Sequence, residues 1–230
     1  MPADTGAVLI TGGASGLGAA VAAAVASAGG TALVLDMRAP ADGVDHELAD
    51  LTRPREAEAA VRRLADRHGG LDAVVTAAGI DVPGALTDVR PEDWERIVAV
   101  NLVGTAAVVR AALPFLVERK GRVVTIASTL GFRAVGDATA YCASKFGVVG
   151  FTRSLAAELA GRVGVTLVVP GGMRTAFFDG REEQYQPGED AALNDPQDVA
   201  EAIAFALRQP VGCELRELVL CPATDPSWPP

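Results

Sequence analysis

Residues 7–18 read Ala-Val-Leu-Ile-Thr-Gly-Gly-Ala-Ser-Gly-Leu-Gly: a short apolar run, a glycine-rich turn from Thr11 to Gly18, and then a stretch with helical periodicity. Glycines permit a turn that other residues resist and let the backbone approach a bound group closely. The helix that follows presents free N–H groups and a partial positive charge at its N-terminus. A strand, a glycine-rich turn and a helix in this order therefore predict a binding site for a nucleotide phosphate.

Short β-branched runs alternate with longer stretches of helical period along the whole chain. This alternation predicts one α/β domain over residues 1–230, with a parallel sheet covered by helices on both faces. Only thirteen residues separate Asp36 from Asp50, so the helix between the second and third strands is expected to be truncated or absent. The expected strands are Ala7–Thr11, Thr31–Asp36, Val44–Leu48, Leu71–Thr76, Arg122–Ala127, Val165–Val169 and Glu217–Cys221, and the expected helices are Leu17–Ala28, Pro54–His68, Pro91–Val117, Ala140–Gly161 and Pro196–Gln209.

Composition narrows the class of protein. Half of the 230 residues are apolar, the net charge is −9, and the arginines are scattered among acidic residues, so no nucleic-acid partner is expected. Cys142, Cys213 and Cys221 have no metal-ligand or disulfide spacing, and no metal is expected. The stretch Met1–Ile10 lacks a basic start, and Ala19–Ala28 is too short for a membrane span, which favours a cytoplasmic protein without a membrane partner.

Asp36 ends the second predicted strand, eighteen residues beyond Gly18. A carboxylate at this position accepts hydrogen bonds from the ribose hydroxyls of adenosine and repels a 2′-phosphate, which favours NAD over NADP. Two observations leave alternatives open: Asp36 could simply cap a loop, and Arg38 could soften the repulsion.

Tyr141 and Lys145 lie four residues apart on one face of a predicted helix, in a chain with only two tyrosines and two lysines. A tyrosine ionises near pH ~10 and must come down by about three units to work as an acid or base near neutrality. One ammonium at ~4 Å supplies about that much in an effective dielectric of ~20. The pair therefore predicts an acid–base site, the alternative being a half-buried tyrosine beside a passing lysine.

These motifs resemble the short-chain dehydrogenase/reductase family over nearly the whole chain. The resemblance implies a doubly wound Rossmann domain with a parallel seven-stranded sheet. It also implies that Ser128, thirteen residues before Tyr141, holds the substrate oxygen, that Tyr141 transfers the proton, and that Lys145 binds the nicotinamide ribose and lowers the tyrosine pKa. Asn101 matches the family asparagine whose backbone anchors a water in the proton relay.

The same resemblance implies a set of cofactor contacts. They are expected from Gly12, Ser15, Gly16, Leu17, Gly18, Asp36, Met37, Asp50, Leu51, Ala78, Gly79, Tyr141, Lys145, Pro170, Gly171, Met173 and Thr175. Ser15 stands where relatives that use NADP often carry a basic residue, in agreement with Asp36. One departure is the sequence Thr76-Ala77-Ala78-Gly79, which replaces the usual Asn-Asn-Ala-Gly and removes an asparagine that normally braces the sheet.

The leading hypothesis is an NAD-dependent oxidoreductase that interconverts a small secondary alcohol and a ketone, with NADP as the less favoured cofactor. A catalytically silent nucleotide sensor or scaffold is the alternative, and a methyltransferase would leave Ser128, Tyr141 and Lys145 unexplained.

Residues 175–194 break the alternation, because Phe177, Phe178 and Tyr185 interrupt an otherwise polar stretch. They predict either a mobile lid over an apolar pocket, with Leu130 and Met173 near its floor, or a subunit contact. By resemblance, a homodimer or homotetramer is expected to form through the helices at 91–117 and 140–161. The tail at 222–230, with its Trp228, is expected to dock on a neighbouring subunit.

Overall fold

The computed structural model describes residues 5–230, so Met1–Asp4, the first part of the stretch examined for a secretory signal, lie outside the described residues. Within residues 5–230 seven strands form a single sheet in the order β3-β2-β1-β4-β5-β6-β7, and every neighbouring pair is parallel. The strands are β1 (Ala7–Thr11), β2 (Thr31–Asp36), β3 (Asp45–Leu48), β4 (Ala73–Thr76), β5 (Arg122–Ile126), β6 (Gly164–Pro170) and β7 (Glu217–Leu220).

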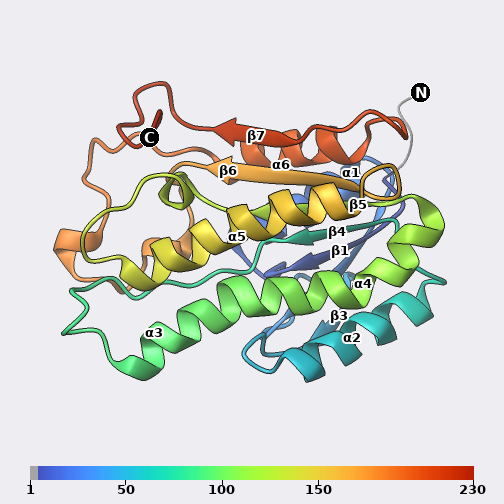
Figure 1. The fold of residues 1–230 in the computed structure, drawn as a ribbon, viewed down its shortest axis with the longest axis horizontal. Coiled ribbons are helices and arrows are strands. Elements are labelled where there is room, and N and C mark those ends of the chain that lie inside the picture. The colour runs from blue at the N-terminus through green and yellow to red at the C-terminus, as the bar shows by residue number, and fades with distance from the viewer. Residues whose placement is uncertain (1–4) are drawn as a thin grey trace.

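Helices cover both faces of this sheet (Figure 1). They are α1 (Gly16–Ser27), α2 (Pro54–Arg67), α3 (Pro91–Val98), α4 (Thr105–Arg119), α5 (Thr139–Glu158) and α6 (Pro196–Leu207). One buried cluster joins α1 and α6 to the sheet, and another joins α2, α4 and the C-terminal part of α5 to its other face. The predicted doubly wound α/β domain is confirmed.

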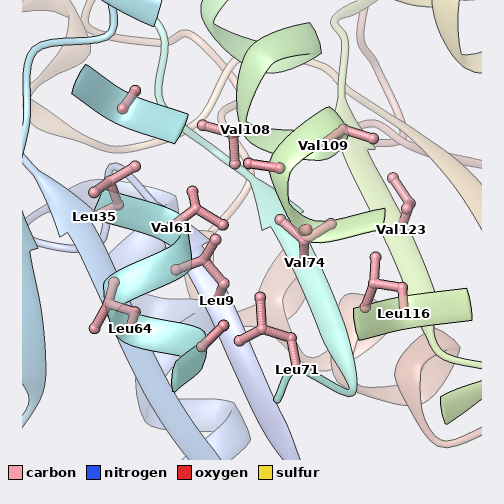
Figure 2. Close-up of a cluster of buried hydrophobic side chains, with 14 of the residues drawn as sticks. Leu9, Leu35, Val61, Leu64, Leu71, Val74, Val108, Val109, Leu116 and Val123 are labelled. Atoms are coloured by element: carbon pink, nitrogen blue, oxygen red, sulfur yellow. The ribbon is translucent and has the colours of Figure 1, made fainter. Parts of the chain in front are cut away.

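The register of the central strands aligns their apolar side chains in rows. Leu9 of β1 is paired with Val74 of β4, and Val74 with Val123 of β5, and all three are fully buried. Figure 2 shows them beneath Leu64 of α2 and Leu116 of α4. Each such side chain contributes roughly 1.5–3 kcal/mol on full burial, which explains why the central strands are apolar on both faces rather than alternating.

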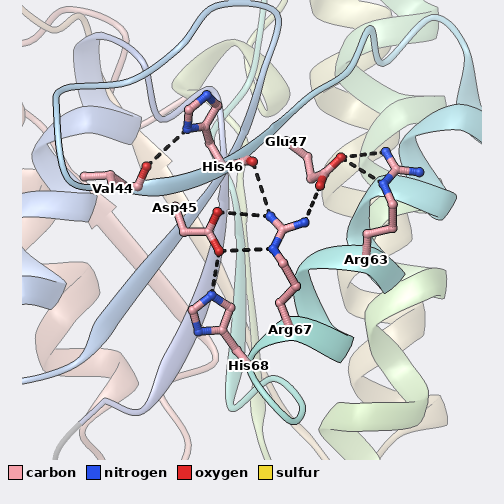
Figure 3. Close-up of polar contacts among 7 residues, drawn as sticks. All are labelled: Val44, Asp45, His46, Glu47, Arg63, Arg67 and His68. Carbon is pink, nitrogen blue, oxygen red and sulfur yellow. Dashed lines mark hydrogen bonds and ion pairs between the residues drawn. The ribbon is translucent and has the colours of Figure 1, made fainter.

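The edge strand β3 differs from the central strands because it carries two acidic side chains, Asp45 and Glu47. No helix lies between β2 and β3, as predicted, and residues 37–44 form bends and turns. Figure 3 shows Arg67 of α2 bonded to both Asp45 and Glu47, while Arg63 holds the other side of Glu47 at 2.6 Å and His68 Nε2 lies 2.7 Å from Asp45 Oδ2. Hydrogen bonds from Arg67 and His68 lower the pKa of Asp45 to about 2. This network ties the sheet edge to α2 and places charge where another strand would otherwise pair.

The helix predicted over Pro91–Val117 is interrupted in the structure. Between α3 and α4, residues Ala99–Gly104 form a π-helical turn, which carries Asn101 inward to 1% exposure. A Cβ at Gly104 would lie only 2.8 Å from Leu51 Cβ, so this turn packs against the segment after β3. Apolar spacing predicts a helix here but does not register a turn widened by one residue. By length and composition the stretch Pro91–Arg119 would suffice to cross a membrane, yet 56% of its most apolar window is buried inside the domain, as in the core helix of a soluble protein.

Residues 222–230 pack on their own chain, and their expected docking on a neighbouring subunit stays a prediction. The ring of Trp228 meets Phe132 edge to face, with ring centres 5.7 Å apart. The Ser227 hydroxyl donates to Thr129 Oγ1 at 2.8 Å, and Arg133 bonds the carbonyl of Pro226. The apolar character of the tail is thus satisfied within the subunit, on the loop that follows Ser128.

Candidate active site

The glycine-rich turn joins β1 to α1 at the edge where all the strands end. A Cβ at Gly12, whose φ is 72°, would lie 2.8 Å from Ala78 Cα, and a Cβ at Gly18 would lie 2.2 Å from Gly12 O. Ser15 is the N-cap residue of α1, but its side chain makes no capping hydrogen bond. The first turn of α1 therefore keeps N–H groups that are available to an anion, and the turn fits the pyrophosphate of a dinucleotide.

The end of β2 is hydrogen-bonded to this turn. Asp36 accepts hydrogen bonds from the backbone N–H groups of Ala14 and Arg38, each at 3.0 Å. The Arg38 guanidinium donates to the Ser15 hydroxyl at 3.2 Å, and Met37 is exposed. The Asp36 carboxylate and the Arg38 guanidinium thus lie together where the adenosine ribose is expected. Position 15 carries no basic side chain, but Arg38 places a guanidinium beside it.

The two residues expected to contact the adenine, Asp50 and Leu51, follow β3, and their side chains lie in different surroundings. Asp50 accepts a hydrogen bond from the Thr52 N–H at 2.9 Å and so closes a turn. Leu51 is only 7% exposed and belongs to the core cluster beneath α2 and α4. The Leu51 side chain therefore packs in the core and cannot contact a cofactor. The backbone of Asp50 and Leu51 and the Asp50 carboxylate are the groups that could do so.

Ser128, Tyr141 and Lys145 are brought together at the ends of β5 and α5. Ser128 follows β5 and is 9% exposed, and its Oγ accepts the Leu130 N–H at 3.1 Å. Lys145 Nζ lies 5.6 Å from the centre of the Tyr141 ring. Burial is the main influence on the Tyr141 phenol and raises its pKa, while a hydrogen bond with Ser128 lowers it.

Lys145 is itself buried, at 5% exposure, and its ammonium donates to the Ile126 carbonyl at 2.9 Å. Burial lowers the pKa of Lys145 to about 8. In the structure the amine therefore points past the phenol toward the end of β5, and the acidification of Tyr141 expected from the i, i+4 spacing does not follow from the protein alone.

The Asn101 side chain holds the segment that follows β4. Its side-chain amide exchanges two hydrogen bonds with the backbone of Ile80, both at 2.9 Å, and also donates to Ser144 Oγ at 3.0 Å. Its own carbonyl accepts the Thr105 hydroxyl at 2.8 Å. A Cβ at Gly79 would lie 3.6 Å from both Asn101 Oδ1 and Lys145 Nζ, which places these two side chains at one point of the chain.

The missing asparagine after β4 is partly replaced. Ala78 N–H donates to Thr11 Oγ1 at 3.1 Å and so joins this segment to the glycine-rich turn. Thr76 is 2% exposed, and within residues 5–230 its Oγ1 has no hydrogen-bond partner. The backbone at Ala78 and Gly79 therefore keeps its place without the asparagine side chain.

The segment after β6 returns to the glycine-rich turn. Pro170 ends β6, and the Gly171 N–H bonds the Leu220 carbonyl at 2.9 Å. Met173 forms a parallel bridge with Asn194, which closes the two ends of segment 175–194. Thr175 lies beside Gly16, where a Cβ would sit 3.5 Å from the Thr175 side chain. In Figure 1 this orange segment lies at the edge toward which the strand arrows point.

Sequence reasoning missed two charged residues at this edge, Asp81 and Arg181. They form an ion pair at 3.2 Å although their side chains are only 7% and 11% exposed. A signal for them existed in the sequence: Asp81 directly follows the Ala-Ala-Gly-Ile segment, and Arg181 is a single arginine among the acidic residues of 175–194.

Comparisons with known proteins agree with this arrangement. The model of the short chain dehydrogenase family matches residues 6–186. An uncharacterised oxidoreductase of Staphylococcus aureus strain MW2 is 32% identical over 226 residues, covering 93% of this chain and 96% of that protein. A D-beta-hydroxybutyrate dehydrogenase of Rhizobium meliloti is 34% identical over 188 residues, covering 74% of this chain and 72% of that protein.

Among solved structures, the ligand-free aldohexose dehydrogenase of Thermoplasma acidophilum has a TM-score of 0.83 at 24% identity and covers 94% of this chain and 92% of its own. An alcohol dehydrogenase of Thermococcus sibiricus, solved with 5-hydroxy-NADP, has a TM-score of 0.82 at 23% identity, with coverages of 93% and 95%. At these identities the two structures establish the shared fold. With the family match over most of the chain, the protein belongs to the short-chain dehydrogenase family and is an NAD(P)-dependent oxidoreductase that acts on CH–OH groups.

Proposed function

We propose that this enzyme interconverts a small secondary alcohol and its ketone with NAD as the preferred cofactor. The observation that carries the proposal is the meeting of Ser128, Tyr141 and Lys145 at the strand edge that also holds the glycine-rich turn. When bound, the nicotinamide supplies the hydride acceptor or donor and, in its oxidised form, a positive charge.

The side chains divide the remaining work between them. Ser128 holds the substrate oxygen, and Tyr141 gives or takes the proton on that oxygen. Lys145 turns its ammonium to the nicotinamide ribose and, as a cation beside the phenol, counteracts the burial that raises the Tyr141 pKa. Asn101 bonds the Ile80 backbone and the Ser144 hydroxyl, and so fixes the chain segment beside Lys145.

The cofactor is held by the residues assigned to it from the sequence, from Gly12 to Thr175. NAD is preferred because a 2′-phosphate would meet the Asp36 carboxylate. Arg38, bonded to Ser15, reduces that repulsion, so the preference for NAD is expected to be moderate. Titration of the protein with NADH and NADPH side by side checks this; tighter binding of NADPH would overturn it.

Segment 175–194 acts as the substrate lid in this proposal. Its Phe177 ring lies 5.7 Å from the Tyr141 ring, and its Tyr185 hydroxyl donates to Asp137 at 3.2 Å. We further propose a cytoplasmic homodimer or homotetramer, supported by exposed apolar side chains in the helical segments expected to form the contact: Val103 in Ala99–Gly104, Val117 in α4 and Phe146 in α5. Light scattering measures the mass, and a monomer would contradict the assembly.

Tyr141→Phe tests the reaction. Removing the hydroxyl should lower kcat for alcohol oxidation by about 10²–10⁴-fold, the usual contribution of acid–base catalysis, and should leave NADH binding nearly unchanged. Phe205→Tyr, which alters an exposed ring on α6, serves as the control and should match the wild type in both measurements. Unchanged turnover in Tyr141→Phe would defeat the proposal.

A further inference from the structure

Asp81 and Arg181 form a charge pair inside the proposed substrate site, and the reaction as described makes no use of it. Asp81 lies five residues beyond the end of β4 at Thr76, and Arg181 lies in segment 175–194, the proposed lid. Arg181 Nη2 is 3.2 Å from Asp81 Oδ2, and both side chains are about nine-tenths buried, with 11% and 7% exposure. Ion pairs of this kind are costly to bury and are seldom retained for stability alone.

The pair lies beside the candidate acid–base group. The Arg181 guanidinium is stacked against two rings, 4.6 Å from the centre of Phe177 and 4.9 Å from that of Phe178. Phe177 is in turn a neighbour of the Tyr141 ring. The two charges also reach the Tyr141 phenol, where Asp81 raises the pKa and Arg181 lowers it. Any substrate that reacts at Tyr141 therefore has this pair as a neighbour.

Part of the hydrogen-bonding capacity of the pair is not used within residues 5–230, although the backbone of Val82 bonds the Asp81 carboxylate. Asp81 Oδ1 is buried without a hydrogen-bond partner, and so are Arg181 Nε and Nη2; the 3.2 Å contact lacks hydrogen-bond alignment. A buried charged group whose hydrogen bonds are incomplete is costly to the fold. The pair therefore offers one free acceptor, Asp81 Oδ1, and two free donors, Arg181 Nε and Nη2. A ligand group that both donates and accepts hydrogen bonds could use them.

We propose that Asp81 and Arg181 form a subsite for a second hydroxyl of the substrate, so that the enzyme prefers neutral diols and hydroxyketones. This inference rests on the proposed function and names its substrate class. A hydroxyl donates to Asp81 Oδ1 and accepts from Arg181 Nε at the same time. A carboxylate accepts only, and it would bring a second negative charge next to Asp81. Because the pair is neutral as a whole, it offers an anion little net attraction.

The aromatic rings complete the subsite. Phe177 and Phe178 present apolar surface to the C–H groups of a small carbon chain, and the lid segment that carries them must move to admit it. Oxidation removes one carbinol hydrogen with two electrons as a hydride to NAD, and the hydroxyl proton passes to the Tyr141 phenolate, which becomes the phenol. The second hydroxyl remains unchanged at the pair, and the product is a hydroxyketone.

Three probes with the same four-carbon chain test this inference in the intact enzyme with NAD: butan-2-ol, butane-2,3-diol and 3-hydroxybutanoate. The diol should have kcat/KM at least about tenfold above both others, since a site built for a hydroxyl discriminates against analogues that lack it. Equal or better kcat/KM for butan-2-ol or for 3-hydroxybutanoate would overturn the inference. Turnover of butan-2-ol would still uphold the proposed function, whereas no turnover of any probe by cofactor-loaded enzyme would count against that function itself.

Charge variants provide the second arm. Asp81→Asn leaves Arg181 uncompensated, so the kcat/KM ratio of 3-hydroxybutanoate to diol should rise at least about tenfold. The double variant Asp81→Asn with Arg181→Gln has no buried charge; it should lose the preference for the diol over butan-2-ol while it still oxidises butan-2-ol. The double variant also covers the case in which Asp81→Asn alone fails to fold. Ratios that stay at the wild-type values would show that the pair does not contact the substrate.

Discussion

The ion pairs that join β3 to α2 and the pair formed by Asp81 and Arg181 use the same two functional groups in opposite surroundings. At the sheet edge, Arg67 is 41% exposed, and it bonds both Asp45 and Glu47. At the site, Arg181 is 11% exposed and makes one poorly aligned contact with Asp81. The edge network fastens one element to another through several aligned bonds, whereas the pair at the site joins segment 175–194 to the segment after β4 through one poorly aligned contact.

The difference separates stabilising charges from functional charges. Exposed ion pairs keep part of their hydration, so they cost little and each contributes modestly to stability. Buried pairs lose hydration and recover it only through complete hydrogen bonding. Lys145 resembles the pair at the site, because its ammonium is buried with a single partner, the Ile126 carbonyl. We therefore expect changes at the site to trade activity against stability and changes at the edge to affect stability alone.

Lys145→Met should produce the largest effect. Its pKa of about 8, against an ordinary value of 10.5, means that holding the charge costs the folded protein on the order of 3 kcal/mol near pH 7. Methionine removes that cost and the bond to Ile126, so unfolding should become harder by about 1–2 kcal/mol, while kcat should fall at least about 10²-fold.

The pH dependence gives an independent measurement for Lys145. A lysine with a lowered folded pKa makes the wild type gain stability as pH rises from about 8 to 10.5. Denaturant unfolding across this range should show the gain in the wild type and a smaller one in Lys145→Met. A variant that is less stable than the wild type at pH 7 would contradict the cost assigned to the buried ammonium.

Replacing the pair at the site with apolar side chains should have the next largest effect. Asp81→Leu together with Arg181→Met removes two buried charges and keeps similar volume, which should stabilise the fold by about 1–2 kcal/mol. Calorimetry or denaturant unfolding measures the change. If the double variant were destabilised instead, the pair would belong with the edge network as a structural contact.

Arg67→Met tests the other side of the comparison. Losing its bonds to Asp45 and Glu47 should destabilise the protein by about 1 kcal/mol, within the range of partly exposed pairs, and should leave kcat/KM unchanged. Arg62→Met on the same helix is the matched control, because its single contact with Glu58 is longer, at 3.6 Å. An equal loss in both variants would mean that the network adds nothing beyond isolated pairs.

Asp45→Asn should give the smallest and most pH-specific effect. The folded pKa of Asp45 is held at about 2, below its ordinary value of 3.8. The carboxylate therefore stabilises the fold above about pH 4, and this contribution disappears as pH falls toward 2. Acid unfolding followed by circular dichroism should show a wild-type advantage at pH 5 that is absent at pH 2; a constant difference would point to a role without charge.

Much of the fold could be predicted because its signals are local. The apolar runs at β1 and β5 each predict a buried strand, and the glycines from Gly12 to Gly18 predict a turn that leads into a helix. The π-helical turn at Ala99–Gly104 could not be predicted in this way, because one extra residue in a helix leaves the apolar pattern nearly intact. The contact between Trp228 and Phe132 could not be predicted either, because the two rings lie 96 residues apart in sequence.

In the candidate site, too, local features could be predicted and contacts between distant residues could not. Tyr141 and Lys145 could be predicted because they lie four residues apart on one helix. The Asp81–Arg181 contact spans one hundred residues and exists only because segment 175–194 folds back onto the segment that follows β4. The spacing also predicts that Lys145 acidifies Tyr141, whereas in the fold, without a cofactor, burial raises the pKa of Tyr141 and lowers that of Lys145.

The packing of the tail has a practical consequence for handling the protein. Ser227 and Trp228 rest on Thr129 and Phe132, directly beyond Ser128. A purification tag or fluorescent fusion attached after Pro230 would pull on the loop that carries the serine. Assays of this enzyme are therefore better served by a tag at the other end of the chain.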